Sequence, residues 1–421
     1  AFEAFSRAAE INPELSTAQI ELGRLLLMSG AADRALEKAQ AVLSRDARHP
    51  DGLLLKAAVF LVKKDPEGAA AVLEPLLAEK GAKPEVYLLL SSAYLQGRHT
   101  GKAEKILQEG IAAHPGFVQL HLAQAKLFAE TLRPGQAEAA LQKVAALEPN
   151  QPLHKFNLAG FMWEQGRQSA AIDLIASVVA ADPANEGTRE AAARFYVAKK
   201  QPFEAAKILE GGVEKLPQSY KMRTMLAEVQ LNQSQPQKAQ ETLEAALKLS
   251  SDPADPGIIQ TKNALAKVHL LLRQPDKAEA YVDEVLKASP KSVEGHYNKG
   301  EIYLTRGDGT NAVAEFRTVV NERPQFIPGH LRLAAAHLFN KEADLALNVL
   351  QAAQKIDPRS KEVLNALARV YALKKDYAQA EEQLRKAADM DPGDPSAQNE
   401  LGDFLAALKR YPEPEEPFRS L

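Results

Sequence analysis

Four histidines are, by residue type and spacing, the side chains of this sequence best suited to metal chemistry. His330 and His337 are seven residues apart and so share one face of a helix, while His269 and His296 occupy comparable places in earlier segments. A zinc site needs three or four ligands that converge on one point. The spacing leaves two interpretations open, a metal site or side chains packed between helices.

Other reactive groups are scarce. The chain has no cysteine, which excludes disulfides, thiolate catalysis and cysteine-based metal sites. It also lacks a Ser/His/Asp order, a phosphate-binding loop and a His-Glu-x-x-His string. We therefore predict no catalytic residues and no cofactor.

Two short motifs resemble recognition signals. Arg306-Gly307-Asp308 has the form of an integrin-binding tripeptide, and Asn232-Gln233-Ser234 has the form of a glycosylation site. Both fall where a turn between two helices is expected, and a glycine there supplies backbone freedom. We expect both motifs to be ordinary turns.

Composition narrows the class of protein. Of 421 residues, 45% are apolar and 25% are charged, which is typical of a folded, soluble chain. The net charge of −3 lacks the basic excess of a nucleic-acid binder. No apolar run approaches the roughly 18 residues of a membrane span. The first residues show no signal-peptide pattern, so cytoplasm and periplasm both stay open.

The sequence contains a pattern that repeats every 34 residues, and the helices that this pattern predicts must position the side chains named above. Two segments, 274–290 and 376–392, share a plan of early alanines, branched aliphatic residues and a closing proline. A five-residue excess near 251–257 interrupts the period once, and the prolines on either side of it are 34 residues apart: Pro115, Pro149, Pro183 and Pro217, then Pro290, Pro324, Pro358 and Pro392. Each repeat predicts two helices; the second ends before the proline, and the proline starts the first helix of the next repeat.

Two positions in each repeat carry small residues. A large side chain at a close helix crossing would overpack it, at a cost of about 1–3 kcal/mol. The first of these positions holds Gly, Ala or Ser, from Gly23 and Ala57 to Gly300 and Gly402. The second holds alanine throughout: Ala35, Ala69, Ala103, Ala137, Ala171, Ala205, Ala239, Ala278, Ala312, Ala346 and Ala380.

With these anchors the chain resembles the tetratricopeptide repeat (TPR) family, whose signature is matched by Tyr297, Gly300, Tyr303, Ala312, Phe316 and Pro324. The resemblance implies an all-α fold, a right-handed α-α superhelical solenoid. We expect one solenoid over 1–421, in the order half repeat 1–15, repeats one to seven 16–253, insertion 254–258, repeats eight to eleven 259–394, and partial repeat 395–421. The family fills the histidine positions with packing aromatics, so we expect packing and no metal.

The resemblance also implies a concave groove, lined by first helices, that binds peptides or helices of partner proteins. In the first half, groove positions read Leu54, Leu88, Leu122 and Phe156, with Trp163 nearby. One hypothesis is an apolar strip that holds hydrophobic side chains of a partner, with Phe156 and Trp163 as anchors. The alternative is that these residues are core.

The second half offers polar candidates. The pairs Asn263 with Lys267 and Asn365 with Arg369 partly resemble the clamp by which some TPR domains hold a C-terminal carboxylate, although the order departs from it. Tyr297 shares the groove position of the two asparagines. Asn157 and Asn298 are the only asparagines at the position where the sugar-transferase TPR arm carries a repeated one.

We therefore expect a non-enzymatic scaffold with protein or peptide partners, no nucleic acid and no membrane span. The array is similar to bacterial TPR lipoproteins and scaffolds of exopolysaccharide or protein-sorting systems. One alternative is a regulatory or substrate-presenting arm of an enzyme whose catalytic domain lies elsewhere. Both ends lack capping repeats, so we also expect a fragment of a longer array, with end-to-end self-association as a third possibility.

Overall fold

The computed structural model describes residues 2–77, 81–390 and 395–408, and within these ranges the chain is all-α, with 24 helices and no strand. Twelve first helices alternate with twelve second helices. The first helices are α2 (Ser16–Met28), α4 (Pro50–Val62), α6 (Pro84–Gln96), α8 (Val118–Glu130), α10 (Pro152–Glu164), α12 (Glu186–Ala198), α14 (Tyr220–Asn232), α16 (Pro256–Leu271), α18 (Val293–Thr305), α20 (Ile327–Phe339), α22 (Lys361–Leu373) and α24 (Pro395–Ala407). The second helices are α1 (Phe2–Ile11), α3 (Ala32–Leu43), α5 (Pro66–Leu77), α7 (Thr100–Ala113), α9 (Pro134–Leu147), α11 (Gln168–Ala181), α13 (Pro202–Lys215), α15 (Pro236–Leu247), α17 (Pro275–Ala288), α19 (Gly309–Glu322), α21 (Ala343–Ile356) and α23 (Tyr377–Met390).

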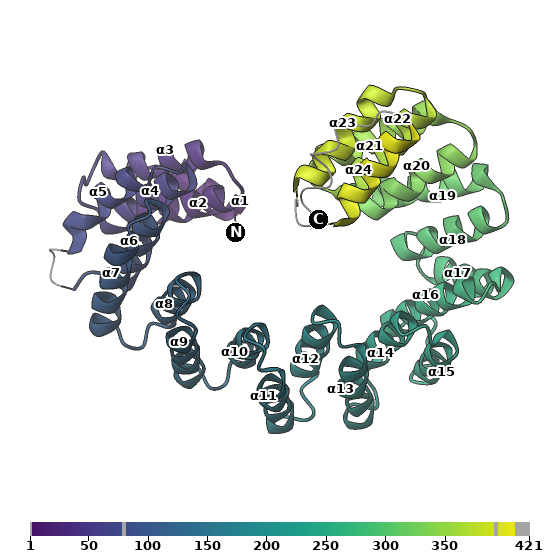
Figure 1. The fold of residues 1–421 in the computed structure, drawn as a ribbon, viewed down its shortest axis with the longest axis horizontal. Helices are drawn as coiled ribbons and strands as arrows, with labels where there is room; N and C mark the ends of the chain where they lie inside the picture. Colours follow the sequence, from purple (N-terminus) through teal and green to yellow (C-terminus); the bar gives the residue numbers. More distant parts are fainter. Residues whose placement is uncertain (1, 78–80, 391–394, 409–421) are drawn as a thin grey trace. The chain divides into compact units, whose positions relative to one another are not determined.

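The chain divides into two compact units, the N-terminal unit (residues 1–195) and the C-terminal unit (residues 196–421). Inside each unit, consecutive helices form hairpins, and each hairpin packs on the next one along the chain (Figure 1). Apolar residues are buried between neighbouring hairpins, as in the cluster formed by Leu54, Leu73 and Leu90 from three successive helices. The all-α solenoid predicted from the repeat is confirmed.

The small residues lie where the helices of a hairpin cross. All eleven alanines of the second small position are fully buried, Ala35 and Ala312 among them. At Gly300, an added Cβ would come within 2.7 Å of the ring of Phe316 on the partner helix. The hairpins therefore close only because these positions carry almost no side chain.

The closing prolines that the structure describes lie in the turns rather than at the start of the next helix. Helix α7 ends at Ala113, Pro115 follows in the turn, and α8 begins at Val118. His114, which precedes the proline, has φ −133° and ψ 66°. The proline ring disfavours the helical conformation at the preceding residue, so the second helix ends before the proline.

At five of the closing prolines, a side chain on the next helix donates an N–H to the proline carbonyl. The residue type varies, but in each of the five the donor is six residues after the proline. His121 Nε2 lies 2.9 Å from the Pro115 oxygen, and because a carbonyl only accepts, this nitrogen carries the proton. The other donors are Gln19 to Pro13 at 3.1 Å, Arg189 to Pro183 at 2.7 Å, His296 to Pro290 at 2.9 Å and His330 to Pro324 at 2.8 Å.

Three of the five extra residues predicted near 251–257 lengthen a helix. Helix α16 has 16 residues, whereas the next first helix, α18, has 13. Asp255 caps it by accepting a hydrogen bond from Gly257 N at 2.7 Å. A Cβ at residue 257 would lie 2.2 Å from the Tyr220 ring, so the close approach of this ring requires glycine there.

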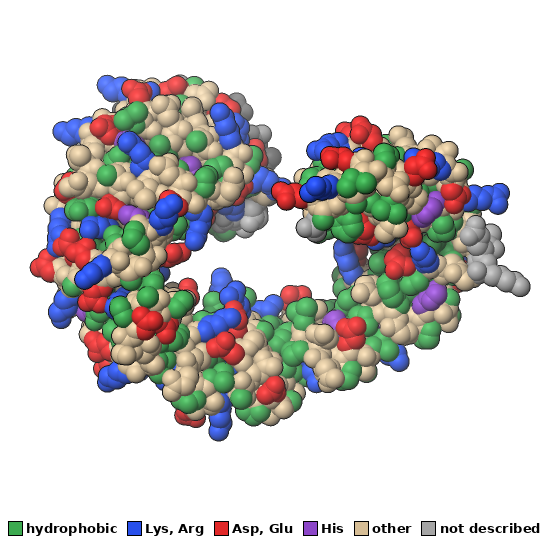
Figure 2. Space-filling view, turned by 180° about the vertical axis from the view of Figure 1, so that it is seen from behind, with side chains coloured by type: hydrophobic (Ala, Val, Ile, Leu, Met, Phe, Trp, Pro, Cys, Tyr) green, Lys and Arg blue, Asp and Glu red, His purple; other side chains and the backbone are tan. Residues whose placement is uncertain are grey.

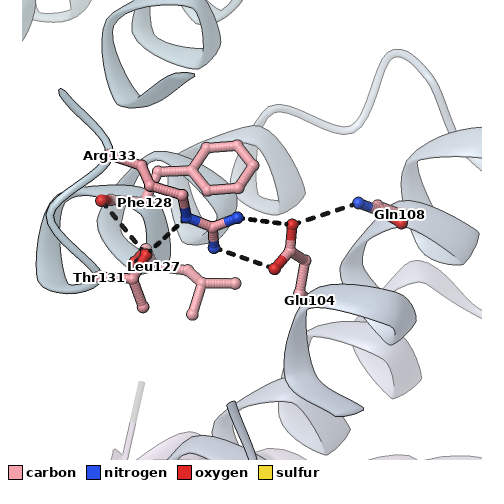
Figure 3. A network of polar contacts seen from close by, with 6 residues as sticks. All are labelled: Glu104, Gln108, Leu127, Phe128, Thr131 and Arg133. Atoms are coloured by element: carbon pink, nitrogen blue, oxygen red, sulfur yellow. Dashed lines mark hydrogen bonds and ion pairs between the residues drawn. The ribbon is translucent and has the colours of Figure 1, made fainter. Parts of the chain in front are cut away.

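Ion pairs connect successive hairpins on their polar sides. Arg133 donates two hydrogen bonds of 2.9 Å to the carboxylate of Glu104 on α7, and its guanidinium lies 4.5 Å from the centre of the Phe128 ring (Figure 3). Arg167 and Glu138, each 34 residues later, form the same pair. The hydrogen bonds and charge of Arg133 hold the pKa of Glu104 below its usual range, against the opposing effect of burial.

Substitution of Ala312 tests the close crossing. Ala312→Leu should lower the free energy of unfolding by about 1–3 kcal/mol, because the buried site has no space for the larger side chain. Ala314→Leu is the matched control, since Ala314 is exposed on the same helix and should change stability by less than about 0.5 kcal/mol. Urea unfolding followed by circular dichroism measures both. Equal effects would contradict the packing role of Ala312.

The Glu104–Arg133 pair predicts a pH-dependent effect of Glu104→Gln. A carboxylate with a lowered pKa in the folded state contributes stability above its unfolded pKa, and that contribution is lost as the pH falls through the folded value. Glu104→Gln should therefore lower the melting temperature at pH 7 and have little effect in strong acid. Glu130→Gln, which removes an exposed pair with Lys126, is the control. A deficit that persists unchanged in acid would show that the ion pair is not its cause.

Candidate functional site

The predicted apolar strip of the N-terminal unit is mostly internal. Leu54 is 5% exposed and Phe156 is 8% exposed, while Leu88 and Leu122 are half-buried. Leu88 packs against the cluster of Leu107, Leu120 and Leu127. This burial favours the core interpretation for Leu54 and Phe156, and a role of the strip in binding stays a prediction.

Trp163 and Asn157 reach the surface of the same unit. Trp163 is half-buried, with its ring in edge-to-face contact with Phe195 at a centroid distance of 5.8 Å. Gly160 lies one helical turn before Trp163, and a Cβ there would be in ordinary contact with the Phe195 ring, at 3.8 Å. Asn157 is exposed. These residues form a small aromatic surface rather than a continuous strip.

In the C-terminal unit, the predicted asparagines of α16 and α18 bind each other. Asn298 is 8% exposed, and its Nδ2 donates to the Asn263 backbone oxygen at 3.1 Å and contacts Asn263 Oδ1 at 3.4 Å. Lys267, one turn further along α16, is exposed. The Asn298 amide thus connects two neighbouring first helices, and Lys267 is the accessible member of this group.

Tyr297 is also held by its neighbours. Its ring makes edge-to-face contacts with Phe316 and Phe326, and its hydroxyl accepts a weak hydrogen bond of 3.4 Å from Arg332 Nε. The same nitrogen lies 2.8 Å from Glu301 Oε1. Burial raises the pKa of Glu301, while the Arg332 charge opposes that rise. The sequence analysis missed Glu301 and Arg332, although both lie on first helices facing the neighbouring repeat.

The other polar pair, Asn365 and Arg369, lies in the wall of a pocket of about 380 Å³ between α20 and α22. The pocket is largely apolar. Besides this pair it is lined by Leu331, Ala334, Ala335, Leu338, Leu350, Glu362 and Ala366. The structure therefore brings together two predicted residues with a hydrophobic floor and an acidic residue that the sequence analysis had not selected.

Asn365 Oδ1 is buried in this wall and accepts no hydrogen bond from any residue that the structure describes. An unpaired buried acceptor costs about 1–3 kcal/mol, and most buried polar atoms have a partner. Its equivalent in repeat eight, Asn263, receives a hydrogen bond from Asn298. The residue 35 positions after Asn365, equivalent to Asn298, is Glu400, whose ionised carboxylate has no N–H to donate.

Two opposite charges flank the unpaired oxygen on the same helix. Glu362 and Arg369 are seven residues apart, or two helical turns, which places them on one face about 10 Å apart along the axis. Glu362 Oε2 accepts a hydrogen bond of 2.9 Å from Ser360. Arg369 is exposed, and no carboxylate of the described residues forms an ion pair with it. The pocket is therefore polarised along α22.

The integrin-type tripeptide at 306–308 and the glycosylation motif at 232–234 both form turns between helices. Arg306 forms ion pairs with Asp276 at 2.7 Å and Glu279 at 2.6 Å, Gly307 adopts φ 79°, and Asp308 caps α19. Ser234 of the glycosylation motif lies in the turn between α14 and α15, with φ 59°. Both expectations of turns are confirmed.

The histidines are packed and hydrogen-bonded. His269 is stacked on Tyr281, and His337 Nδ1 lies 2.7 Å from Glu342 Oε2. His269, His330 and His337 are buried, as predicted for packing residues. Among the described residues, no group of three or more His, Asp or Glu side chains is placed to hold a metal ion.

None of the helices in the described ranges combines the length and apolar character needed to cross a bilayer. The side chains at the surface are of mixed type, with acidic and basic groups interspersed on the face shown in Figure 2.

Two plant proteins are similar to short parts of this chain. The Hsp70-Hsp90 organizing protein of Triticum aestivum is 26% identical over 87 residues, which is 21% of this chain and 15% of the plant protein. Hsp70-Hsp90 organizing protein 3 of Arabidopsis thaliana is 28% identical over 86 residues, 20% of this chain and 15% of its own length. Among solved structures, the APC/C hetero-tetramer Cut9-Hcn1 has a chain that aligns with a TM-score of 0.44 at 15% identity, over 96% of this chain and 92% of that one.

Family models match longer parts of this chain than the two plant proteins do. One model of the tetratricopeptide repeat matches residues 20–84, 122–186, 263–325 and 375–421, and a second matches 61–127 and 303–370. The matched segments include more than half of the chain and extend over both compact units. This chain belongs to the tetratricopeptide repeat family.

Proposed function

We propose that this protein is a non-enzymatic scaffold that holds peptide or helical segments of partner proteins along its first helices, with the pocket between α20 and α22 as a principal contact. Its TPR repeats indicate a protein–protein interaction scaffold. The observation that carries the specific site is the buried, unpaired Asn365 Oδ1 beside an apolar pocket. A bound peptide would supply the missing donor from its main chain once the Asn365 amide turns toward the pocket, because Oδ1 itself has almost no accessible surface in this structure.

The pocket suits a side chain of a partner. Leu331, Leu338 and Leu350 contribute branched aliphatic groups, and Ala334 and Ala335 leave the space that forms the pocket. Burial of an aliphatic side chain there would contribute about 25 cal/mol for each Å² removed from water. A polar atom at the edge of such a pocket fixes the orientation of the ligand. The geometry therefore supports recognition of an extended segment rather than a flat protein surface.

We further propose a bacterial multiprotein system of the envelope or exopolysaccharide type, on the basis of the long array rich in Ala, Gln and Leu. The alternative is an arm that presents substrates to, or regulates, a catalytic domain outside this chain. Self-association through exposed hairpin faces is a further alternative. Light scattering over a concentration series separates self-association from binding of a different protein.

Peptide selection tests the proposed function. Random peptides of about a dozen residues displayed on phage are selected against the whole chain and then measured by fluorescence polarisation. Enriched peptides should bind the chain and lose affinity about tenfold or more with Ala335→Phe, which fills the pocket. Circular dichroism confirms that the variant is folded. Selection that enriches no binding peptide would overturn the proposal.

Asn365→Leu should separate stability from binding. Because it removes an unpaired buried acceptor at similar volume, it should leave the free energy of unfolding unchanged or raise it by about 1 kcal/mol, while weakening the selected peptides. Asn263→Leu is the matched control, since that amide oxygen is contacted by Asn298 and its loss should destabilise the fold. Urea unfolding measures both variants. Strong destabilisation by Asn365→Leu would assign Asn365 a structural role.

A further inference from the structure

We infer that one edge of the C-terminal unit binds the surface of a bilayer that contains anionic phospholipids. This edge, the turn edge, consists of four turns that each lead from a first helix to a second helix: residues 271–275, 305–309, 339–345 and 373–377. The inference goes beyond the proposed function, because it concerns the turns rather than the pocket between α20 and α22. The contact lies in the headgroup region, so it needs no helix that crosses the bilayer.

Exposed apolar side chains of the C-terminal unit are confined to turns of this kind. Among the described residues of the unit, each exposed large apolar side chain belongs to the last two residues of a first helix or the first three of a second helix. These residues are Leu271, Phe339, Leu345, Leu373 and Tyr377 on the turn edge, and Val197 and Phe203 at an earlier turn. Single exposed apolar residues are ordinary on a protein surface, but their restriction to one kind of turn indicates a shared contact.

The fold does not require apolar residues at these places. The last residue of the first helix is Leu271, Phe339 or Leu373 in three repeats, but it is Gln96 in α6 and Asn232 in α14. The hairpins of α6 with α7 and of α14 with α15 are nevertheless closely packed. Leu271 is 59% exposed and Leu373 is 64% exposed, so the interior gains little from them. Their apolar surface is therefore available to an external partner.

Three basic residues of the turn edge have no partner. Arg273, Lys341 and Lys375 are exposed and form no ion pair with any described residue. Their φ angles are 57°, 63° and 63°, a region that favours glycine, and Gly307 holds the equivalent position in the remaining turn. The dipole of the preceding helix favours a cation there, but it does not account for the apolar residues beside each one. These three turns thus combine a free cation with exposed apolar side chains.

The acidic residues of the turn edge are bound within the chain. Each accepts a hydrogen bond or forms an ion pair: Asp308 with Asn311 N at 3.0 Å, Asp376 with Gln379 N at 3.2 Å, Glu342 with His337 at 2.7 Å, and Asp344 with Lys374. The charges of the turn edge that lack a partner are therefore positive. They complement the anionic headgroups of a bilayer.

Contacts between successive repeats place the four turns side by side. Arg306 in the second turn pairs with Asp276 at 2.7 Å, directly after the first turn. A Cβ on Gly309 would lie 2.8 Å from the Phe339 ring, so the third turn lies against the second. The Asp344 ion pair described above joins the fourth turn to the third. The apolar residues and the free cations therefore belong to one continuous edge.

This mixture of side chains suits a phospholipid surface better than nucleic acid or protein. A protein that lies on a bilayer buries apolar side chains at the headgroup boundary while its Lys and Arg residues stay with the phosphates. Single-stranded nucleic acid is held by aromatic side chains on which bases stack, whereas Leu271, Leu345 and Leu373 are aliphatic. Protein interfaces are depleted in lysine, whereas Lys341 and Lys375 are the free cations of two turns. Anionic phospholipid is therefore the partner that fits both kinds of side chain.

Flotation of the whole chain with vesicles tests the inference. The probes are vesicles of phosphatidylcholine and vesicles with equal parts of phosphatidylcholine and phosphatidylglycerol. Wild type should float with the mixed vesicles and not with the neutral ones. Leu271→Gln/Leu373→Gln should weaken binding to the mixed vesicles about tenfold or more, because two exposed apolar side chains are lost. Ile11→Gln/Leu153→Gln, a matched change at exposed sites of the N-terminal unit, should leave binding unchanged.

Removal of charge supplies the second comparison. Lys341→Gln/Lys375→Gln should also weaken binding about tenfold or more, because each lysine near an anionic surface contributes attraction. Lys287→Gln/Lys355→Gln is the matched control and should bind as wild type does, since it removes the same charge from exposed residues at the far ends of α17 and α21. Circular dichroism confirms that each variant is folded. If a double variant is not, its two single variants replace it.

Three results would overturn the inference. They are wild type that floats with neither kind of vesicle, binding that the leucine variant leaves unchanged, and binding that both control variants weaken as much as the test variants do. Labelled single-stranded DNA is measured alongside, and DNA binding without flotation, abolished by the lysine variant, would assign the turn edge to nucleic acid instead. None of these variants changes a residue that lines the α20–α22 pocket, so the peptide selection tests the proposed function separately.

Discussion

Close contact between paired helices is the constraint on which this structure depends. Each hairpin has too little apolar surface to fold alone, so it is stable only when its two helices approach closely and pack against the next hairpin. Ala312 and its ten equivalents, all fully buried, permit that approach. Where a larger residue faces the crossing, as Phe316 does, its partner is reduced to glycine, as at Gly300. The space at this helix crossing thus admits one large side chain only if the residue that faces it is small.

Most of this fold could be predicted from the sequence because the constraint is local and repeated. Small residues at the crossing and a proline after each second helix recur at a fixed spacing, so a single chain displays the pattern many times. The proline was nevertheless assigned to the start of the next helix, whereas it lies in the turn three residues earlier. Its effect acts through the residue before it, His114 for example, and spacing alone does not reveal which side of the proline is affected.

The candidate site was less accessible to sequence reasoning. Asn365 and Arg369 were identified from their helical spacing, but their significance comes from residues on two other helices, α20 and α21, which form the pocket. Likewise, Asn298 and Asn365 are both asparagines on first helices. The Asn298 amide donates a hydrogen bond to Asn263 on the neighbouring helix, whereas Asn365 Oδ1 has no hydrogen-bond partner among the described residues. That difference depends on the residue type in the adjacent repeat and on three-dimensional contact.

The hydrogen bond from a first-helix side chain to the proline carbonyl has a consequence for how such a chain evolves. At the five prolines that have this bond, donor and acceptor are six residues apart, so both belong to one short stretch of the gene. A duplication or deletion of whole repeats with its ends outside that stretch carries both partners together. Because Gln, His and Arg all serve as donors, the donor position also tolerates later substitution among these residues. A new repeat could thus be inserted in the array without a compensating mutation where it joins its neighbours.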